Sequence, residues 1–138
     1  MKTHFETFEH EADIGVRGFG TTMEEAFENA ARGLYSVMVN IDAVKPIKKR
    51  SVAVSASDSE LLLVEWLNAL LSLSDVERMV FSKFAVTRDG ATITGIAWGE
   101  ELDRERHMPR VEVKAATYHM LRVDRDDGRY VAQCVVDV

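Results

Sequence analysis

Three short polar groups stand in stretches that are otherwise apolar or small, and their residue types are ones that can do chemistry. The first is His10-Glu11-Ala12-Asp13, near the start of the chain. The second is Lys114, which lies in the stretch Val113-Lys114-Ala115-Ala116-Thr117-Tyr118-His119. The third is Asp137, which is followed by the last residue, Val138. Carboxylates, lysines and histidines in such settings hold metal ions or stabilise phosphates.

Asp13 and Asp137 are both acidic residues with apolar neighbours in predicted strands. Two carboxylates held close together repel each other unless a cation or a proton lies between them. The end of the chain at Val138 supplies further oxygen ligands. A ligand set made of oxygen atoms, without cysteine, favours a hard ion such as Ca²⁺, Mg²⁺ or Mn²⁺. We therefore expect Asp13, Asp137 and Val138 to form a divalent-cation site.

Lys114 has apolar and small neighbours, which argues against a purely solvated role. A lysine beside such a site can stabilise a phosphate or pyrophosphate as charge develops. Each of these residues also has a structural alternative. Asp13 can be a turn or edge-strand residue, Asp137 a solvated residue near the end of the chain, and Lys114 an edge-strand lysine that discourages aggregation.

Several well-known signatures do not occur in the sequence. A zincin motif would need a second histidine where Ile14 stands. The stretch 124–128 begins like a calcium-binding EF-hand loop, but its glycine comes one residue early and Val135 occupies the twelfth position. Gly18-Phe19-Gly20 lacks the third glycine and the lysine of phosphate-binding loops. No Gly-x-Ser-x-Gly motif occurs, and no aromatic pair on a predicted strand resembles an RNA-recognition sheet.

Hydropathy patterns predict the elements that must position these residues. We expect strands over 5–8 and 12–19, the second because Ile14 and Val16 alternate with polar or small residues. Two overlapping capping boxes, Thr21 with Glu24 and Thr22 with Glu25, predict a helix whose apolar stripe reaches position 37. Residues 45–50 are expected to form a basic loop, and 51–57 a strand.

The second predicted helix is apolar on nearly all sides between Leu61 and Leu73. A capping box of Ser57 and Glu60 is expected to open it. Such a helix must be buried on nearly all sides, so we expect it to pack against a sheet and to be covered by a further layer. Two hairpins, 80–98 and 111–136, have Asp-Gly turns and flank a charged loop over 99–110. The order β-β-α-β-α-β-β-β-β predicts an α+β fold with two helices and mostly antiparallel sheet.

The length and composition exclude several classes of protein. A chain of 138 residues predicts one domain over 1–138. The net charge of −6 disfavours strong direct binding to nucleic acid. The lone Cys134 rules out an internal disulfide and fits a reducing compartment. There is no apolar signal segment and no stretch near the roughly 20 apolar residues that a membrane span needs, so we expect a cytoplasmic protein.

Taken together in order, four blocks of the sequence resemble the archease family. His10-x-Ala12-Asp13-Ile14 is similar to that family's His-Thr-Ala-Asp-Ile block, and Asp137-Val138 to its terminal Asp-Ile. The stretches 61–71 and 113–119 resemble its apolar helix and its Val-Lys-Ala-x-Thr-Tyr-His strand. There are two departures: Glu11 stands where threonine is usual, and Val138 where isoleucine is usual. Glu11 adds a negative charge beside the expected metal site.

The resemblance implies a metal-binding protein cofactor rather than an enzyme. Archeases activate the RtcB-type tRNA-splicing RNA ligase, promote guanylylation of the ligase's histidine, support multiple turnover and can broaden nucleotide use. The family's calcium site corresponds here to Asp13, Asp137 and Val138. Our hypothesis is that Asp13, Asp137 and Lys114 form one polar tip that enters the ligase's nucleotide site.

Two other functions remain open from the sequence. One is a free-standing metal-dependent phosphoester hydrolase, although no nucleophile with its own activating base is recognisable. The other is a general chaperone-like module for RNA-modifying enzymes. Turnover of phosphoesters by the purified protein alone would favour the first, and promiscuous partner binding independent of Asp13 would favour the second.

Overall fold

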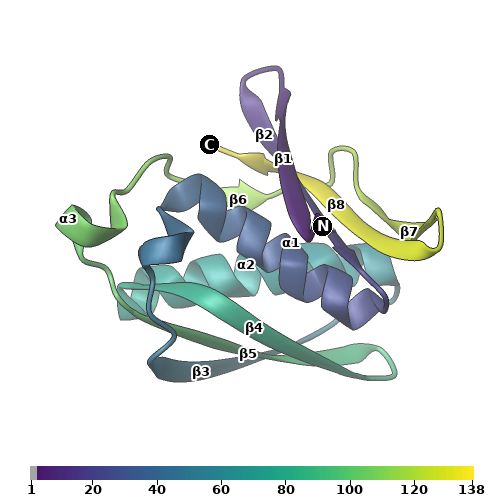
Figure 1. The fold of residues 1–138 in the computed structure, drawn as a ribbon. Helices are drawn as coiled ribbons and strands as arrows, with labels where there is room; N and C mark the ends of the chain where they lie inside the picture. The colour runs from purple at the N-terminus through teal and green to yellow at the C-terminus, as the bar shows by residue number, and fades with distance from the viewer. Residues whose placement is uncertain (1–2) are drawn as a thin grey trace.

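A computed structural model describes residues 3–138 of the chain. Two long helices lie between two antiparallel sheets (Figure 1). The elements are β1 (Phe5–His10), β2 (Asp13–Gly20), α1 (Met23–Met38), the 3₁₀ turn η1 (Ile41–Ala43), β3 (Lys48–Ser55), α2 (Ser59–Glu77), β4 (Met79–Asp89), β5 (Thr92–Glu101), α3 (Arg104–His107), β6 (Ala115–Ala116), β7 (Arg122–Asp126) and β8 (Arg129–Asp137).

The strands pair only in the antiparallel sense within residues 3–138, which confirms the predicted α+β class. The larger sheet has the order β1-β2-β8-β6, and β7 pairs with the other half of β8. The smaller sheet has the order β3-β5-β4. In the described part of the chain no helix is both long enough and apolar enough to span a membrane.

Helix α1 begins where the sequence predicts. The Glu25 amide donates to the Thr22 hydroxyl at 3.1 Å, and the Glu25 carboxylate accepts from the Thr21 amide at 2.9 Å. This reciprocal cap satisfies backbone groups that the first helical turn leaves without partners. The apolar stripe then packs directly on β2, because a Cβ atom at Gly18 would lie 2.2 Å from the Ala30 nitrogen. Only glycine allows this close approach of helix and strand.

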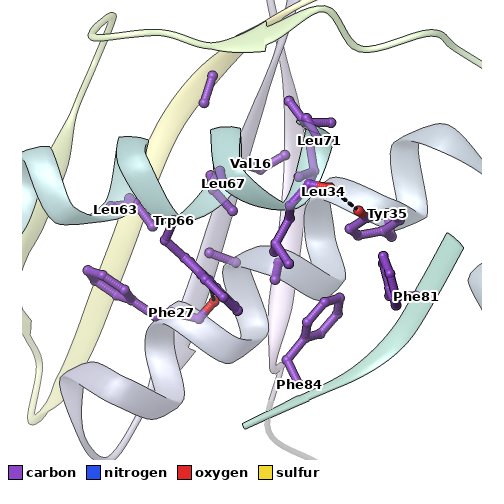
Figure 2. Close-up of a cluster of buried hydrophobic side chains, with 14 of the residues drawn as sticks. Val16, Phe27, Leu34, Tyr35, Leu63, Trp66, Leu67, Leu71, Phe81 and Phe84 are labelled. Atoms are coloured by element: carbon purple, nitrogen blue, oxygen red, sulfur yellow. Dashed lines mark hydrogen bonds between the residues drawn. The ribbon is translucent and has the colours of Figure 1, made fainter. Parts of the chain in front are cut away.

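Helix α2 is the buried central helix that its composition predicts. It contacts both sheets, and Trp66 and Leu67 are fully buried. The Trp66 indole donates to the Phe27 carbonyl oxygen of α1 at 3.0 Å and packs against Gly95 of β5. Figure 2 shows these side chains meeting those of α1 and β4 in one apolar cluster. The expected cap at Ser57 is wrong: Asp58 caps the helix and accepts from the Leu61 amide at 2.8 Å.

The sequence-based expectations differ from the structure in three further places. The predicted strand over 111–123 is broken into β6 and β7. Between them the Thr117 hydroxyl donates to the Val135 carbonyl at 2.7 Å and accepts from the His119 amide at 3.2 Å. Such local side-chain bonds compete with a continuous strand ladder. In addition, β3 already starts at Lys48 within the expected basic loop, and the expected loop over 99–110 contains the end of β5 and helix α3.

Helix α3 is held to the sheet by one carboxylate. Glu100 accepts from Arg106 at 2.6 and 2.9 Å, from the Lys45 amide at 2.8 Å and from His107 Nε2 at 2.9 Å. His107 Nδ1 accepts from the Asp103 amide, which assigns the ring proton to Nε2. Chiefly through Arg106, and with help from the Lys45 amide and His107, this environment holds the pKa of Glu100 well below its usual range, although burial opposes the shift.

Candidate functional site

The two aspartates meet at one end of the larger sheet. Strands β2 and β8 pair antiparallel, with Ile14 opposite Val136 as the last pair of the ladder. One further step along this register sets Asp13 opposite Asp137. Directly opposite residues of an antiparallel pair project on the same face, with their Cβ atoms roughly 5 Å apart. Continued in this way, the register predicts that two carboxylates from opposite ends of the sequence are neighbours at this sheet end.

Strand β6 adds the main chain of Lys114 to this sheet end. The Lys114 amide donates to the Asp137 carbonyl oxygen at 2.8 Å, and Ala115 is opposite Asp137. Because side chains alternate along a strand, Lys114 starts from the face opposite to that of the two carboxylates. It lines a hollow of about 490 Å³ beside α2, together with Asn68 and Asp75. Lys114 is exposed.

Two histidines pack against each other near this sheet end. His10 is opposite Asp13 in the β1–β2 ladder. Its ring centroid lies 5.8 Å from that of His119, which the turn after β6 carries back toward β1. His10 Nδ1 is buried and has no hydrogen-bond partner among residues 3–138. Sequence reasoning missed the pairing of His10 with His119, because it treated the segment containing His119 as a regular strand.

Glu11 lies in the turn between β1 and β2, two residues before Asp13. It is exposed, and it has a φ of 54°. The effect of its charge on the expected metal site stays a prediction.

The donor set at this sheet end suits a hard cation. Asp13 and Asp137 offer carboxylate oxygens, and Val138 offers main-chain oxygens. Within the described residues no three His, Cys, Asp or Glu side chains are grouped closely enough to hold a metal ion. Asp13 and Asp137 are only two such side chains, so main-chain oxygens and water would have to complete the shell. Calcium and magnesium commonly accept such mixed oxygen shells.

These observations define a class: an α+β protein in which two antiparallel sheets enclose a helix pair, with two aspartates facing each other at one end of the larger sheet. The particular family follows from comparison with known proteins. The chain belongs to the archease family, since the model of the Archease protein family matches residues 5–138.

Individual relatives agree over nearly the whole length. Protein archease of Thermococcus gammatolerans is 48% identical over 139 residues, which cover 97% of this chain and 98% of the relative. Protein archease of Sulfurisphaera tokodaii is 43% identical over 136 residues with the same coverage. The solution structure of Methanobacterium thermoautotrophicum protein 1598 matches with a TM-score of 0.86 at 38% identity, covering 98% of this chain and 99% of that one.

A solved structure with much lower sequence identity has the same fold. The crystal structure of a Thermotoga maritima protein described as an archease and possible chaperone matches with a TM-score of 0.63. It covers 96% of each chain at 19% identity, a level at which the likeness concerns the fold alone.

Proposed function

We propose that this chain is a metal-binding protein cofactor that activates an RtcB-type tRNA-splicing RNA ligase. In this proposal it promotes guanylylation of the ligase's histidine, supports multiple turnover and broadens the ligase's use of nucleoside triphosphates. Membership of the archease family supports the proposal. The observation that supports it best is that the β2–β8 ladder ends at Ile14 and Val136, so that Asp13 and Asp137 are the next residue of each strand at this sheet end.

The proposal gives each residue a role. Asp13, Asp137 and Val138 would hold a divalent cation, most simply Ca²⁺, with Mg²⁺ and Mn²⁺ as alternatives. A bound cation supplies positive charge that stabilises phosphate oxygens. The exposed ammonium group of Lys114, which is anchored through its main chain to Asp137, would contact the departing pyrophosphate.

The covalent step belongs to the ligase in this proposal. The ligase's histidine nitrogen attacks the α-phosphate of GTP, a nitrogen–phosphorus bond forms, and the bond to the pyrophosphate oxygen breaks. The archease chain contributes charge and position without forming a covalent bond. Preorganised charge of this kind stabilises the transition state because it needs no rearrangement during the reaction.

A guanylylation assay on the purified ligase tests the proposal. Labelled GTP is supplied with and without this chain, across Ca²⁺, Mg²⁺ and Mn²⁺. Asp13→Asn keeps the shape of the side chain but removes its charge, and it should reduce stimulation to the level without the chain. Asp42→Asn is the matched control, since Asp42 is an exposed aspartate of η1 that forms no hydrogen bond or ion pair within residues 3–138.

The same assay separates the competing functions. Full stimulation by a folded Asp13→Asn protein would refute the proposed role of the sheet end. Hydrolysis of nucleotides by this chain without ligase would support the hydrolase instead. Equal capture of many unrelated RNA-modifying enzymes by the wild type and by Asp13→Asn would support a general chaperone-like module.

A further inference from the structure

The smaller sheet has a face that no described element covers. Side chains alternate along β5: Gly95 packs against Trp66 of α2, whereas Ile96 and Trp98 project to the other side. Figure 1 shows both long helices on one side of β3, β5 and β4, with no element of residues 3–138 on the opposite side. This outer face is also directed away from the larger sheet that carries Asp13 and Asp137.

The most distinctive feature of the outer face is a row of three side chains across the three strands. Trp98 of β5 is opposite both Lys49 of β3 and Lys83 of β4. The Lys83 ammonium lies 5.0 Å from the centroid of the Trp98 indole. Neither lysine forms an ion pair with any acidic group in the described part of the chain.

The basic residues next to this row are different, because they are already neutralised. Lys48 pairs with Glu101 at 3.1 Å, and Arg50 pairs with Glu77 at 2.7 Å. On a protein with a net charge of −6, two unpaired lysines beside one half-buried indole form a local positive site with an aromatic centre.

Most residues around the row have short side chains. The next row has Ile96 at its centre, between Ser51 and Ala85, and the row beyond consists of Ala53, Thr94 and Thr87. Ile96 extends the apolar surface of the indole, and short side chains flank it. Two acidic residues lie on this side of the sheet. Asp89 is at the far end, in the last pair of the ladder, opposite Thr92. Glu100 follows Trp98 on the same side of β5, but its charge is already paired with Arg106 and its carboxylate also contacts His107. A flat surface with one indole and two cations matches the shape and charge of a stacked nucleotide with its flanking phosphates.

We propose that this face binds single-stranded RNA. One base stacks on Trp98 in place of the Lys83 ammonium, which moves from above the ring to an adjacent phosphate, while Lys49 contacts the phosphate on the other side of that nucleotide. The two lysines stand two strand spacings apart, which is about 10 Å. Hydroxyl groups such as those of Ser51 and Thr94 provide partners for the ribose 2′-hydroxyl, the group that distinguishes RNA from DNA. Aromatic platforms on sheets bind unpaired bases in this way.

The proposal predicts weak binding with a defined salt dependence. Single strands lose affinity with a log–log slope of about −0.7 for each neutralised phosphate, so two contacts give about −1.4. Affinity should then fall about seven-fold between 50 and 200 mM salt. Anisotropy of a labelled ten-nucleotide oligouridylate, titrated with this protein alone, measures that slope without any ligase. The result is therefore independent of the proposed activation function.

Substitutions test each part of the row. Lys83→Gln and Lys49→Gln should each lower the slope to about −0.7, and Trp98→Ala should weaken binding at least about five-fold. Arg125→Gln is a matched control for loss of a cation on an aromatic ring, because Arg125 stacks on Tyr130 of the other sheet at 5.3 Å. Tyr118→Ala controls for loss of an exposed aromatic side chain. Both controls should bind like the wild type.

Tryptophan emission reports on the same site. Trp66 is fully buried, so quenching by added RNA must come from Trp98. Circular dichroism verifies that each variant is folded, and Trp98→Phe, which retains a stacking ring, should keep most of the affinity. Three results would overturn the proposal. The first is no binding of oligouridylate at 50 mM salt, and the second is equally tight binding of oligodeoxyuridylate or double-stranded RNA. The third is binding of polyglutamate with the same dependence on Trp98, which would assign the face to an acidic protein partner.

Discussion

Glu100 offers a sharp test of how this fold is held together. Its carboxylate accepts four hydrogen bonds: two from Arg106, one from His107 and one from the Lys45 amide. Only 12% of its side chain is exposed, and the His107 ring is fully buried. These bonds tie the segment after η1, strand β5 and helix α3 together. Removing the charge of Glu100 should therefore loosen all three.

The expected loss can be derived from these contacts. Three of the four bonds are to Oε2 and only one, from Arg106 Nη2, is to Oε1. Glu100→Gln keeps the three when its amide oxygen takes the place of Oε2, but its NH₂ group then faces Arg106 Nη2 and that bond is lost. Hydrogen bonds to charged groups contribute about 1.5–3 kcal/mol each, and the three remaining bonds weaken because their acceptor is neutral. Partial relaxation lowers the sum, so we expect the free energy of unfolding to fall by about 2–4 kcal/mol. Urea denaturation at pH 7 measures this change.

The neighbouring residue supplies the control. Glu101 has one contact, an ion pair with Lys48 at 3.1 Å, and its side chain is 73% exposed. Exposed pairs contribute about 0–1 kcal/mol, so Glu101→Gln should change stability by less than about 1 kcal/mol. If the two variants lose equal stability, the four-bond arrangement at Glu100 does not stabilise the fold as described.

The pH dependence gives an independent check with a definite sign. The folded-state pKa of Glu100 is lowered, chiefly by Arg106, so its contribution is fully present above the ordinary carboxyl value of 4.5 and declines as the pH falls below it. The difference in stability between the wild type and Glu100→Gln should therefore be largest near pH 7 and smaller at pH 3. A difference that grows on acidification would contradict the assigned ion pair.

Three further predictions concern the core and the candidate metal site. Gly95→Ala would place a Cβ atom 2.0 Å from the buried Trp66 ring, so urea denaturation should show a loss of about 1–3 kcal/mol or more, and an unchanged midpoint would contradict the packing. Burial raises the pKa of the Cys134 thiol to about 12, so a thiol reagent at pH 8 should modify the native protein far more slowly than the protein in urea; equal rates would refute this. Calcium at a hundred times its dissociation constant should stabilise the wild type by about 2.7 kcal/mol in thermal denaturation. The same calcium concentration should leave the stability of Asp13→Asn unchanged. Without metal, Asp13→Asn should be as stable as the metal-free wild type or slightly more so, because one of two repelling carboxylates is gone.

The long elements could be predicted because their signals are local. The cap of Thr22 and Glu25 and the apolar stripe after it define the start and the buried side of α1. The nearly continuous apolar surface between Leu61 and Leu73 predicts a helix buried on most sides, and α2 contacts both sheets. The errors occur where a neighbouring residue competes for the same role. Asp58 rather than Ser57 caps α2, and the local hydrogen bonds of Thr117 interrupt the predicted strand.

What the sequence by itself determined is the two long helices, most of the strands, the class of fold and the residue types able to hold a hard cation. Periodicity, capping and side-chain chemistry are properties of short segments, which is why these features could be predicted. Only the tertiary structure decided which of those residues meet. The β2–β8 ladder ends at Ile14 and Val136, one residue from Asp13 and Asp137, and the turn after β6 carries His119 to His10. Strand pairing likewise places Trp98 between Lys49 and Lys83. Such neighbours depend on strand register, and register is set by the packing of whole sheets on the helices rather than by any local pattern in the chain.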